Sequence, residues 1–437
     1  MQRFKERFVE YAKFDSRLLG EAIGIAGLAA TTVMRATGRG SRALEIETSM
    51  HRNAFSRVAD GVVSRRVKRS IARPEAERLE RYVATLTPQR STDALFRDPQ
   101  RLLGQRIIAL KSPANGEKGA LLLDYSFVFS LFARSFDVER IAERYHIIVE
   151  PSWSGSCDRD VLSLAGRPFP VFVQNNEPRD IEFIRRLGLN LVSVPIAANW
   201  WVDPRVFRPL EGAVKECDVL MNSAWARFKR HESFFEVLAK LRARGERLRV
   251  RLIGYRMDMT RDDVMALAQQ HGVADQIETF EGLRPEQVNE QLNHAKVNLV
   301  WSRREGSNRA IIEGFSAGVP GILRKGFNYG YHYPYINPRT GAFATEAGLS
   351  DTLLDIIRNP DRYDPRTWVM QNMTPQLATK AIDDAIARHA ARSGEKWTPG
   401  TLAVKVTSLH SMAYWDEAER PRFEPDYAFL RSALRPR

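Results

Sequence analysis

The sequence predicts an α/β protein with two Rossmann-like domains and a helical, basic N-terminal extension. The chain has 437 residues, 43% of them hydrophobic, which is enough for two cores of ordinary size. From about residue 106 onward, short apolar runs of strand type alternate with helical patterns, as in parallel sheets. The predicted parts are the extension at 1–100, a first Rossmann-like domain at 104–208, a second at 209–392 and a C-terminal tail at 393–437.

The extension is the most basic part of the chain. Residues 1–73 hold 15 Lys/Arg and 7 Asp/Glu, and they supply +8 of the net charge of +13. Phe4, Phe8, Tyr11 and Leu18 recur at helical spacing, with basic residues between them. This pattern predicts an amphipathic helix that either contacts an anionic membrane surface through residues 1–35 or packs on its own protein.

The apolar stretch at 18–34 contains Glu21 and follows a long charged segment. It is short for a membrane span and does not fit a secretory signal, so we expect a buried or interfacial helix. The two cysteines, Cys157 and Cys217, have no metal-ligand spacing and favour a reduced, cytosolic protein.

The first domain is expected to have strands at 106–111, 146–150, 170–174 and 190–195. The loop after its first strand holds three residues that can present a cation or backbone N–H groups to a phosphate or an acceptor, or that form an ordinary turn: Gly116, Lys118 and Gly119. Trp153 and Asn176 follow later strands and are candidates for acceptor binding, although a Trp is more often packed. Asp158 and Asp160 have the spacing of a metal-binding pair, but so short a pattern often arises by chance, and no metal site is predicted.

In the second domain, strands are expected near 218–222, 249–253, 277–280, 297–301 and 320–324. The run at 302–320 reads as a strand–loop–helix junction with Glu305 in the loop and Glu313 about two turns into the helix. A helix that opens at 306–308 directs N–H groups and a positive dipole end at a diphosphate. Gly306 allows a close approach, and Ser307 or Asn308 can cap the helix. With Glu305 on sugar hydroxyls and Glu313 on a ribose, this junction suits a nucleotide-sugar.

The junction resembles the Glu-x7-Glu signature of retaining GT-B glycosyltransferases, family 4 in particular. Four further segments are similar to that family in the right order: 202–209, which resembles the approach to the inter-domain linker; 221–238, with Lys229 at the phosphate-binding lysine; 250–254, with Gly254 in the turn after the second strand; and 280–288, with Leu283 in the base-binding turn.

The chain also departs from the family pattern. The family has Gly-Phe-Gly after the first Glu, where this chain has Gly306, Ser307 and Asn308. An Arg common five positions before the lysine is replaced by Ala224, and Arg227 is the candidate substitute. The His that the family has at a strand end of its first domain has no clear counterpart near 170–177.

The resemblance implies a GT-B fold, with the two domains facing a cleft and the tail packing back towards the first domain. It implies transfer of a sugar from a nucleoside-diphosphate donor to a glycan or lipid-linked acceptor, with retention and without metal or other cofactor. Glu305 and Lys229 are then the catalytic residues. The donor-binding residues are Glu313, Arg227, Gly306, Ser307, Asn308, Arg309, Gly254 and Leu283. The expected location is cytoplasmic, at the inner face of the membrane.

Two alternatives of other classes stay open. An isoelectric point near 9.8 permits binding to a nucleic-acid backbone, although interleaved aromatic and basic patches are lacking, and nucleic acid is the less favoured partner. A sugar-nucleotide epimerase, or an inactive donor-binding homologue on the same fold, is the other alternative.

Overall fold

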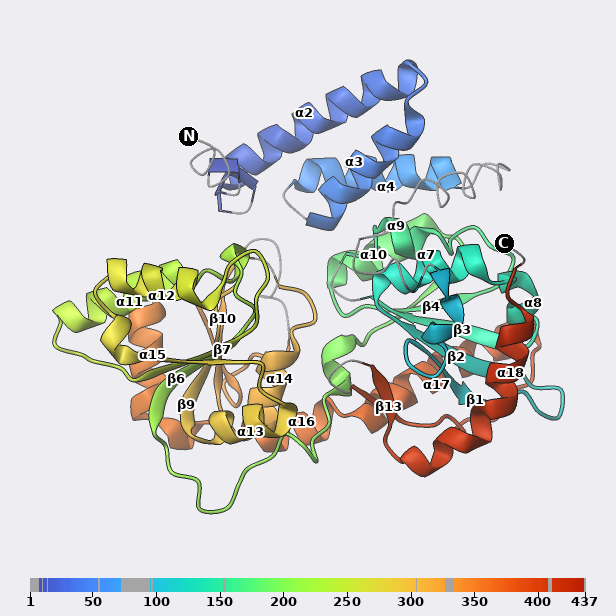
Figure 1. The fold of residues 1–437 in the computed structure, drawn as a ribbon. Coiled ribbons are helices and arrows are strands. Elements are labelled where there is room, and N and C mark those ends of the chain that lie inside the picture. Colours follow the sequence, from blue (N-terminus) through green and yellow to red (C-terminus); the bar gives the residue numbers. More distant parts are fainter. Residues whose placement is uncertain are drawn as a thin grey trace. The chain divides into compact units, whose positions relative to one another are not determined.

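The structure is a computed structural model and describes residues 8–9, 11–13, 15–53, 56–71, 95, 97–151, 155–303, 305–326, 334–407 and 411–435. It forms two compact units, which are described separately below (Figure 1). Unit 1 comprises Met1–Trp201 and Pro375–Arg437, and unit 2 comprises Val202–Thr374. Each unit is built around a sheet of mainly parallel strands, so the predicted α/β class is confirmed.

The sheet of unit 1 has five strands in the order β1-β2-β3-β4-β5. Their bounds are β1 Ile107–Lys111, β2 Gly119–Asp124, β3 Tyr145–Glu150, β4 Val171–Gln174 and β5 Leu191–Val194. β2 to β5 are parallel, and β1 is antiparallel to β2. Every residue of β1 to β4 is buried, as expected for strands that are covered on both faces.

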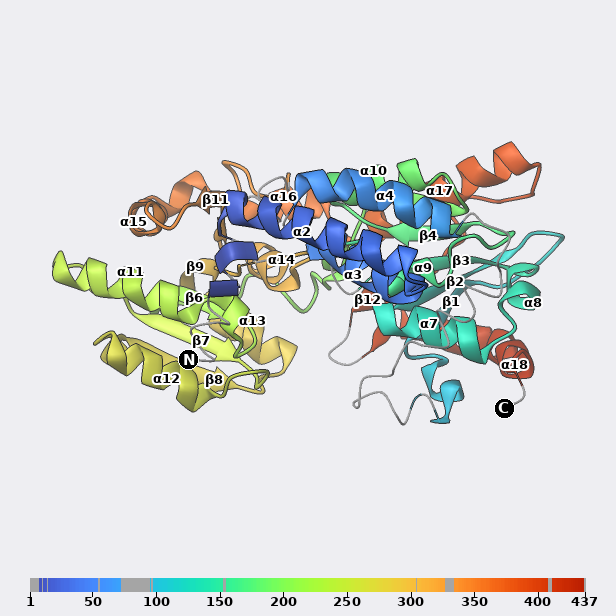
Figure 2. The same ribbon diagram turned by 90° about the horizontal axis from the view of Figure 1, so that it is seen from above.

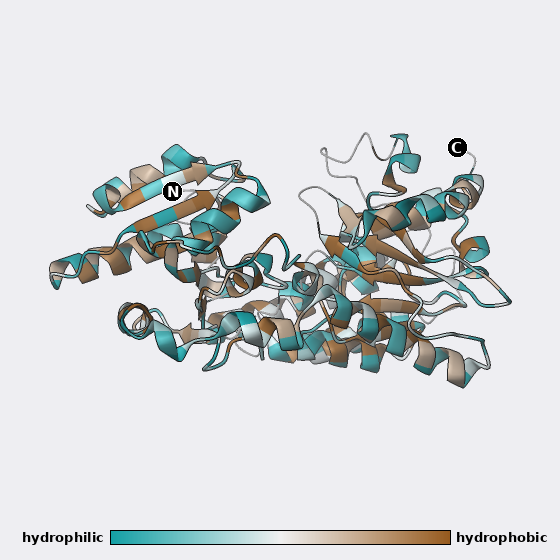
Figure 3. Cartoon of the chain, turned by 90° about the horizontal axis from the view of Figure 1, so that it is seen from below, coloured by the Kyte–Doolittle hydropathy of each residue, from teal (hydrophilic) through white to brown (hydrophobic). Residues whose placement is uncertain are grey.

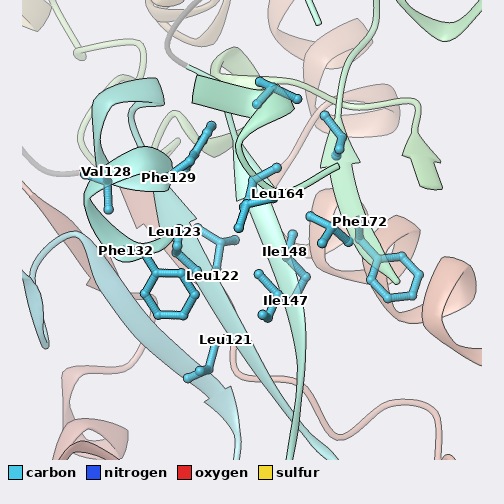
Figure 4. Close-up of a cluster of buried hydrophobic side chains, with 14 of the residues drawn as sticks. Leu121, Leu122, Leu123, Val128, Phe129, Phe132, Ile147, Ile148, Leu164 and Phe172 are labelled. Atoms are coloured by element: carbon cyan, nitrogen blue, oxygen red, sulfur yellow. The ribbon is translucent and has the colours of Figure 1, made fainter. Parts of the chain in front are cut away.

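The core of unit 1 lies between this sheet and its helices. Figure 4 shows Leu121 and Leu123 of β2 and Ile147 of β3 beside Phe129 and Phe132 of helix α7 (Ser126–Ser135). In the hydropathy view, these strands are mostly hydrophobic, whereas the helices mix both classes (Figure 3). The other elements of this part are η2 Pro99–Leu102, α8 Val138–Ala142, α9 Arg159–Leu162, α10 Pro178–Leu187 and η3 Ala198–Trp201.

Strand β2 was not predicted, because the sequence around 119–124 was read only as an apolar stretch after a loop. β1 and β2 form a hairpin, and the loop at 112–118 therefore lies at the amino ends of the parallel strands. The expectation that this loop follows a strand of the parallel sheet is wrong, whereas a role of its residues in ligand binding stays a prediction. In parallel sheets, ligands bind at the opposite, carboxyl edge.

The C-terminal part of the chain belongs to unit 1, from Pro375 onward. Its elements are α17 Pro375–Ser393, β12 Lys405–Thr407, β13 Met412–Tyr414, η7 Glu417–Phe423 and α18 Glu424–Ser432. The sequence had suggested that residues 375–392 belong to the second domain. That boundary is wrong, because α17 buries Ile382 and Ile386 in the core of unit 1. The tail lies on β1, where the Tyr414 hydroxyl donates to the Ala109 carbonyl at 2.7 Å.

Before the sheet of unit 1, the described residues include three long helices that lie next to one another in both ribbon views (Figure 1, Figure 2). They are α2 Arg17–Ala36, α3 Gly40–Asn53 and α4 Arg57–Ile71. α2 contains the apolar stretch predicted to be a buried or interfacial helix. Only Gly20, Gly24 and Thr31 of α2 are buried, which contradicts the buried alternative and leaves the interfacial one. Phe4, part of the predicted amphipathic pattern, lies outside the described residues.

Unit 2 has a six-stranded parallel sheet in the order β11-β10-β9-β6-β7-β8. The strands are β6 Cys217–Asn222, β7 Val250–Gly254, β8 Ile277–Glu281, β9 Ala295–Val300, β10 Gly321–Arg324 and β11 Gly341–Ala344. The first five match the predicted strands closely, and β11 was missed. The helical elements are η4 Arg227–Lys229, α11 His231–Ala243, α12 Arg261–Gln270, η5 Ala274–Gln276, α13 Pro285–Asn293, α14 Arg309–Ser316, α15 Leu349–Arg358, η6 Pro360–Arg362 and α16 Pro365–Asn372.

Candidate donor site in unit 2

The predicted donor residues of unit 2 come from four consecutive segments of its sheet. Lys229 follows β6, Gly254 ends β7, Leu283 follows β8 and Glu305 follows β9. Because all these strands are parallel, these residues lie at one edge of the sheet. That edge is the carboxyl one, where open α/β sheets bind their ligands.

Lys229 and Glu305 meet at this edge although 76 positions separate them. The Lys229 ammonium donates to Glu305 Oε2 at 2.7 Å, and only 12% and 18% of the two side chains are exposed. The Arg303 N–H donates to the Phe228 carbonyl at 2.7 Å and joins the same two loops. The structure therefore brings together the two residues predicted to be catalytic.

Helix α14 begins beside this pair. Asn308 is its N-cap, and the Asn308 side chain accepts from the Ile311 N–H at 2.9 Å. Of the two predicted caps, Asn308 is thus the one used, while Gly306 is buried and Ser307 is partly exposed. The helix opens at Arg309, so Glu313 lies little more than one turn from its start rather than about two.

Glu313 of α14 is half-buried and accepts a hydrogen bond from the end of β6. The Asn222 amide, at the end of β6, donates to Glu313 Oε2 at 3.2 Å. Burial raises the pKa of Glu313 above its ordinary value, and the nearby Arg309 and the Asn222 hydrogen bond counter only part of that rise. A carboxylate in this position gains from a ligand that donates hydrogen bonds to it.

Sequence reasoning missed Asn298, which positions α14. Asn298 is fully buried in β9, and its amide donates to the Ala310 carbonyl at 2.7 Å. A Cβ at Gly314 would lie 2.3 Å from the Asn298 amide nitrogen, so Gly314 lets helix and strand approach closely. The polar Asn298 within the otherwise apolar run at 297–301 was the signal that could have identified it.

Gly254 has a packing role that its predicted binding role did not include. A Cβ at Gly254 would lie 2.6 Å from the Ser223 carbonyl and from the Trp225 ring. Trp225 is fully buried, and its indole N–H donates to Glu281 Oε1 at 3.1 Å. Leu283, two residues further on, is partly exposed.

Two further residues lie close to Lys229 in the chain: Arg227, a predicted donor-binding residue, and His231. Arg227 begins η4 after β6, and its backbone N–H donates to Asp258 Oδ1, after β7, at 3.3 Å. His231 begins α11 and is buried, and burial together with the adjacent Lys229 lowers its pKa to about 4. The buried His231 ring packs against Trp225, with the two ring centroids 5.5 Å apart, and so serves the core of unit 2.

A further carboxylate near the edge was not predicted. Glu346 follows β11 and pairs with Arg230 and with Arg324 of β10, the latter at 2.9 Å. It also accepts from the Ser233 hydroxyl at 2.7 Å. These contacts tie α11 to β10 and to the loop after β11, and no sequence motif indicated them.

The predicted acceptor residues of unit 1 do not come together. Lys118 pairs with Glu395 at 3.4 Å, and a Cβ at Gly119 would lie 2.4 Å from the Lys111 carbonyl, while Gly116 is exposed with positive φ. Asn176 follows β4 at the carboxyl edge and is partly exposed. Trp153 lies outside the described residues.

The predicted chance match at Asp158 and Asp160 has structural contacts. Asp158 caps α9 by accepting from the Asp160 N–H at 2.9 Å, and it pairs with Arg52 at 2.7 Å. Asp160 accepts from the Ser130 hydroxyl at 2.5 Å. These contacts explain why the two carboxylates are there.

The sequence of unit 2 matches the model of the glycosyl transferases group 1 family over residues 206–362. This segment is a glycosyl transferases group 1 domain. It runs from just after the start of unit 2 to η6 and contains every predicted donor residue. The comparison with curated proteins finds no match for the chain.

Solved structures with some similarity to the chain include glycosyltransferases. Sucrose-phosphate synthase from Thermosynechococcus elongatus is 14% identical, with 63% of this chain and 74% of that chain covered and a TM-score of 0.48. The Anabaena HepE protein in complex with UDP and glucose is 12% identical, with 61% and 78% covered and a TM-score of 0.47. The C-terminal domain of the group 1 protein LpcC from Francisella tularensis is 16% identical, with 40% and 98% covered and a TM-score of 0.34. Since these TM-scores are below 0.5, the assignment of the domain rests on the family model.

Proposed function

We propose that the chain transfers a sugar from a nucleoside-diphosphate donor to an acceptor hydroxyl, with the donor bound by the group 1 domain. The contact between Lys229 and Glu305, beside the N-terminus of α14, carries the proposal. It combines a cation, a helix dipole and a carboxylate at the ligand-binding edge of a parallel sheet.

The group 1 domain supplies a role for each part of the donor. Lys229, with Arg227, and the N–H groups at 306–308 neutralise the diphosphate, which gains charge as it departs. In the structure, Glu305 pairs with Lys229. With a donor bound, the diphosphate takes that cation and Glu305 holds sugar hydroxyls. Glu313 accepts from the ribose hydroxyls.

The reaction proposed is front-face transfer with retention. The bond between the anomeric carbon and the diphosphate oxygen breaks, and the acceptor oxygen bonds to the same face of the sugar. The acceptor proton passes to the departing diphosphate, so the enzyme needs no base. Neither a metal ion nor another cofactor enters this scheme. Lys229 and the helix dipole serve as the positive charges.

The acceptor proposed is a glycan or a lipid-linked glycan at the cytoplasmic face of a membrane. Residues 1–35 contribute the contact with an anionic membrane surface. The support is the excess of positive charge at 1–73 and the exposed apolar residues of α2. A protein at the surface where the lipid acceptor resides meets it by diffusion in two dimensions.

The test is a thermal-shift panel with UDP, GDP and ADP on the wild-type protein, on Lys229→Ala and on the matched control Lys240→Ala. Lys240 is an exposed residue of α11, so its replacement by Ala removes the same charge outside the site. A ligand at 100 times its Kd adds about 2.7 kcal/mol of stability. We expect one nucleotide to stabilise the wild type and the control but not Lys229→Ala, and equal stabilisation of all three proteins would contradict the site.

The same panel separates the alternatives. A short single-stranded DNA that stabilises the protein when no nucleotide does would favour the nucleic-acid reading. If a nucleotide binds, its sugar conjugate is then incubated without acceptor and the sugar is analysed. Conversion to an epimer without any acceptor would indicate an epimerase and would overturn the transfer reaction.

A further inference from the structure

The outward face of helix α2 carries no charged side chain. Of the charged residues of α2, Arg17 lies at its start, Glu21 is only partly exposed and Arg35 lies near its end. All its exposed residues after Arg17 are apolar or small: Leu18, Leu19, Ala22, Ile25, Ala26, Ala29, Ala30, Thr32, Val33 and Ala36. Leu18, Ile25 and Val33 are 85%, 54% and 63% exposed. An uncharged face about 27 Å long is unusual on a helix that faces water.

The inward face of α2 packs closely on α3 and α4. A Cβ at Gly24 would lie 2.3 Å from Ser56, just before α4, and a Cβ at Gly27 would lie 2.3 Å from Met50 of α3. The small residues Gly20, Gly24 and Gly27 therefore serve contacts inside the protein. They are not available for pairing α2 with a second membrane helix.

A carboxylate ties the first half of α2 to the start of α4. Glu21 accepts from the Ser56 hydroxyl at 2.7 Å and from the backbone N–H of Arg57 at 2.9 Å. It thereby satisfies N–H groups at the helix start, and these hydrogen bonds outweigh burial, so the pKa of Glu21 is lowered. Glu21 faces α4 rather than the exposed apolar face.

A buried ion network ties the second half of α2 to both neighbours. Glu47 of α3 is fully buried and pairs with Arg35 of α2 and with Arg66 of α4. Burial alone would raise the pKa of Glu47, but the hydrogen bonds from the two guanidinium groups lower it. Arg66 also donates to Thr31 at 3.1 Å and to Thr32 at 2.7 Å.

These contacts distinguish two ways in which α2 could bind a membrane: spanning the bilayer or lying in the plane of its surface. By length and hydropathy, α2 is a candidate membrane span, with 20 residues, a mean hydropathy of 1.3 and 17% of that window buried. Spanning would require Glu21 and Arg35 to leave their partners and would place charge within the bilayer, which is unfavourable. Lying in the plane of the surface keeps every tie and buries only the apolar face.

The charge of this region selects the kind of surface. Residues 11–71 hold eleven Lys/Arg and five Asp/Glu. Arg17 and Arg39 are both exposed and flank the apolar face of α2. Each Lys or Arg near an anionic bilayer adds to the electrostatic attraction. An anionic lipid surface therefore matches both the apolar face and the charge around it.

We propose that α2 lies in the plane of an anionic membrane surface, with its uncharged face in the boundary between headgroups and acyl chains. This inference deepens the membrane contact proposed above and does not depend on the transfer reaction. Within unit 1, α3 and α4 connect α2 to α10. Asp60 of α4 pairs with Arg179 of α10 at 2.7 Å, and the centroids of the His51 and Phe183 rings are 4.7 Å apart. Unit 1 is thereby held at the surface.

The first experiment is co-sedimentation with vesicles of phosphatidylcholine alone and of an equimolar mixture with phosphatidylglycerol. We expect the full chain to bind the anionic vesicles. The double variant Ile25→Glu with Val33→Glu should lose at least tenfold in affinity, and Val214→Glu, at a 68% exposed site in unit 2, should bind as the wild type does. No binding by the wild type, or equal binding by the double variant, would overturn the proposal.

The second experiment distinguishes lying from spanning. Cys157 and Cys217 are buried, so single cysteines at Leu18, Ile25 and Val33 can be labelled selectively with a polarity-sensitive dye. An in-plane helix places the three dyes at the same shallow depth. A spanning helix places Ile25 deep and the other two near the two surfaces, and that pattern would overturn the proposal.

A second copy of the chain is the competing occupant of the apolar face. Sedimentation velocity without lipid tests it: a dimer that the double variant abolishes, combined with no vesicle binding, would replace the membrane by self-association. Unfolding temperatures of all variants are measured alongside, and nucleotide shifts are recorded on the same samples. Loss of vesicle binding with intact nucleotide binding distinguishes failure here from failure of the proposed function.

Discussion

The Lys229 ammonium lies 2.7 Å from Glu305 Oε2, and the two residues belong to loops after different strands of one parallel sheet. Lys229 ends the short 3-10 helix η4 after β6, and Glu305 lies between β9 and α14. Their positions are set by the adjacent strands β6 and β9 and by the hydrogen bond between Arg303 and Phe228. The ion pair therefore marks where the two loops converge.

Removal of the cation from this pair is expected to damage transfer more than folding. Lys229→Ala should lower kcat by about 100-fold or more, since it removes stabilisation of the departing diphosphate. The measurement is the initial rate with the donor identified by thermal shift, with Lys240→Ala as control. Equal rates for wild type and Lys229→Ala would reject the assignment.

Glu313→Gln should separate stability from binding. Burial raises the pKa of Glu313. Ionisation of Glu313 therefore lowers the free energy of unfolding, and this loss develops as the pH rises through the pKa of the folded state. The neutral amide keeps the shape and accepts from Asn222, and the unfolding temperature at neutral pH should stay the same or rise. Nucleotide affinity should fall, because an uncharged oxygen is a weaker acceptor for ribose hydroxyls. A variant that loses stability and keeps its affinity would contradict this role.

His231 should make unit 2 sensitive to mild acid. Its pKa is lowered to about 4, so protons bind the unfolded chain more tightly than the folded one. The stabilisation is present above the unfolded pKa of about 6.5 and is lost as the pH falls towards 4, with a magnitude on the order of 3 kcal/mol. Urea unfolding at several pH values measures it. His231→Phe, which keeps a ring against Trp225, should flatten the slope, and an unchanged slope would exclude His231 as its source.

Gly254→Ala tests whether Gly254 is required for packing. The added methyl would meet the Ser223 carbonyl and the Trp225 ring, so we expect a loss of about 1–3 kcal/mol in the free energy of unfolding. Chemical denaturation gives the value. Gly272→Ala is not a suitable control because φ is positive there, whereas Gly61, with open space around its Cβ, is suitable. If Gly254→Ala keeps full stability but binds nucleotide more weakly, Gly254 is required for ligand binding and not for packing.

Glu47→Gln should loosen the N-terminal helices without affecting unit 2. It leaves Arg35 and Arg66 beside a neutral group in a buried site, and breaking such a network costs about 3–5 kcal/mol. Hydrogen exchange should quicken in α2, α3 and α4 and stay unchanged in α11 to α15. Unchanged exchange in α2 would show that its second half is held by other contacts.

The sequence by itself determined the α/β class, nearly all the strands of unit 2 and the candidate residues for a donor site. The run at 302–320 could be interpreted because strand, loop and helix follow one another directly in the chain, so local patterns carry the information. Asn308 as the cap of α14 is of this kind.

Only the tertiary structure decided which of these residues meet. The pairing of Lys229 with Glu305 and the hold of Asn222 on Glu313 depend on strand order, which no local pattern records. Strand β2 and the place of α17 in unit 1 depend on packing between distant segments. Likewise, the hydropathy of α2 was evident in the sequence, but its exposed face became clear only when α3 and α4 covered the opposite side. Burial is a property of the packed chain, and an apolar helix has no outward face until its neighbours are placed.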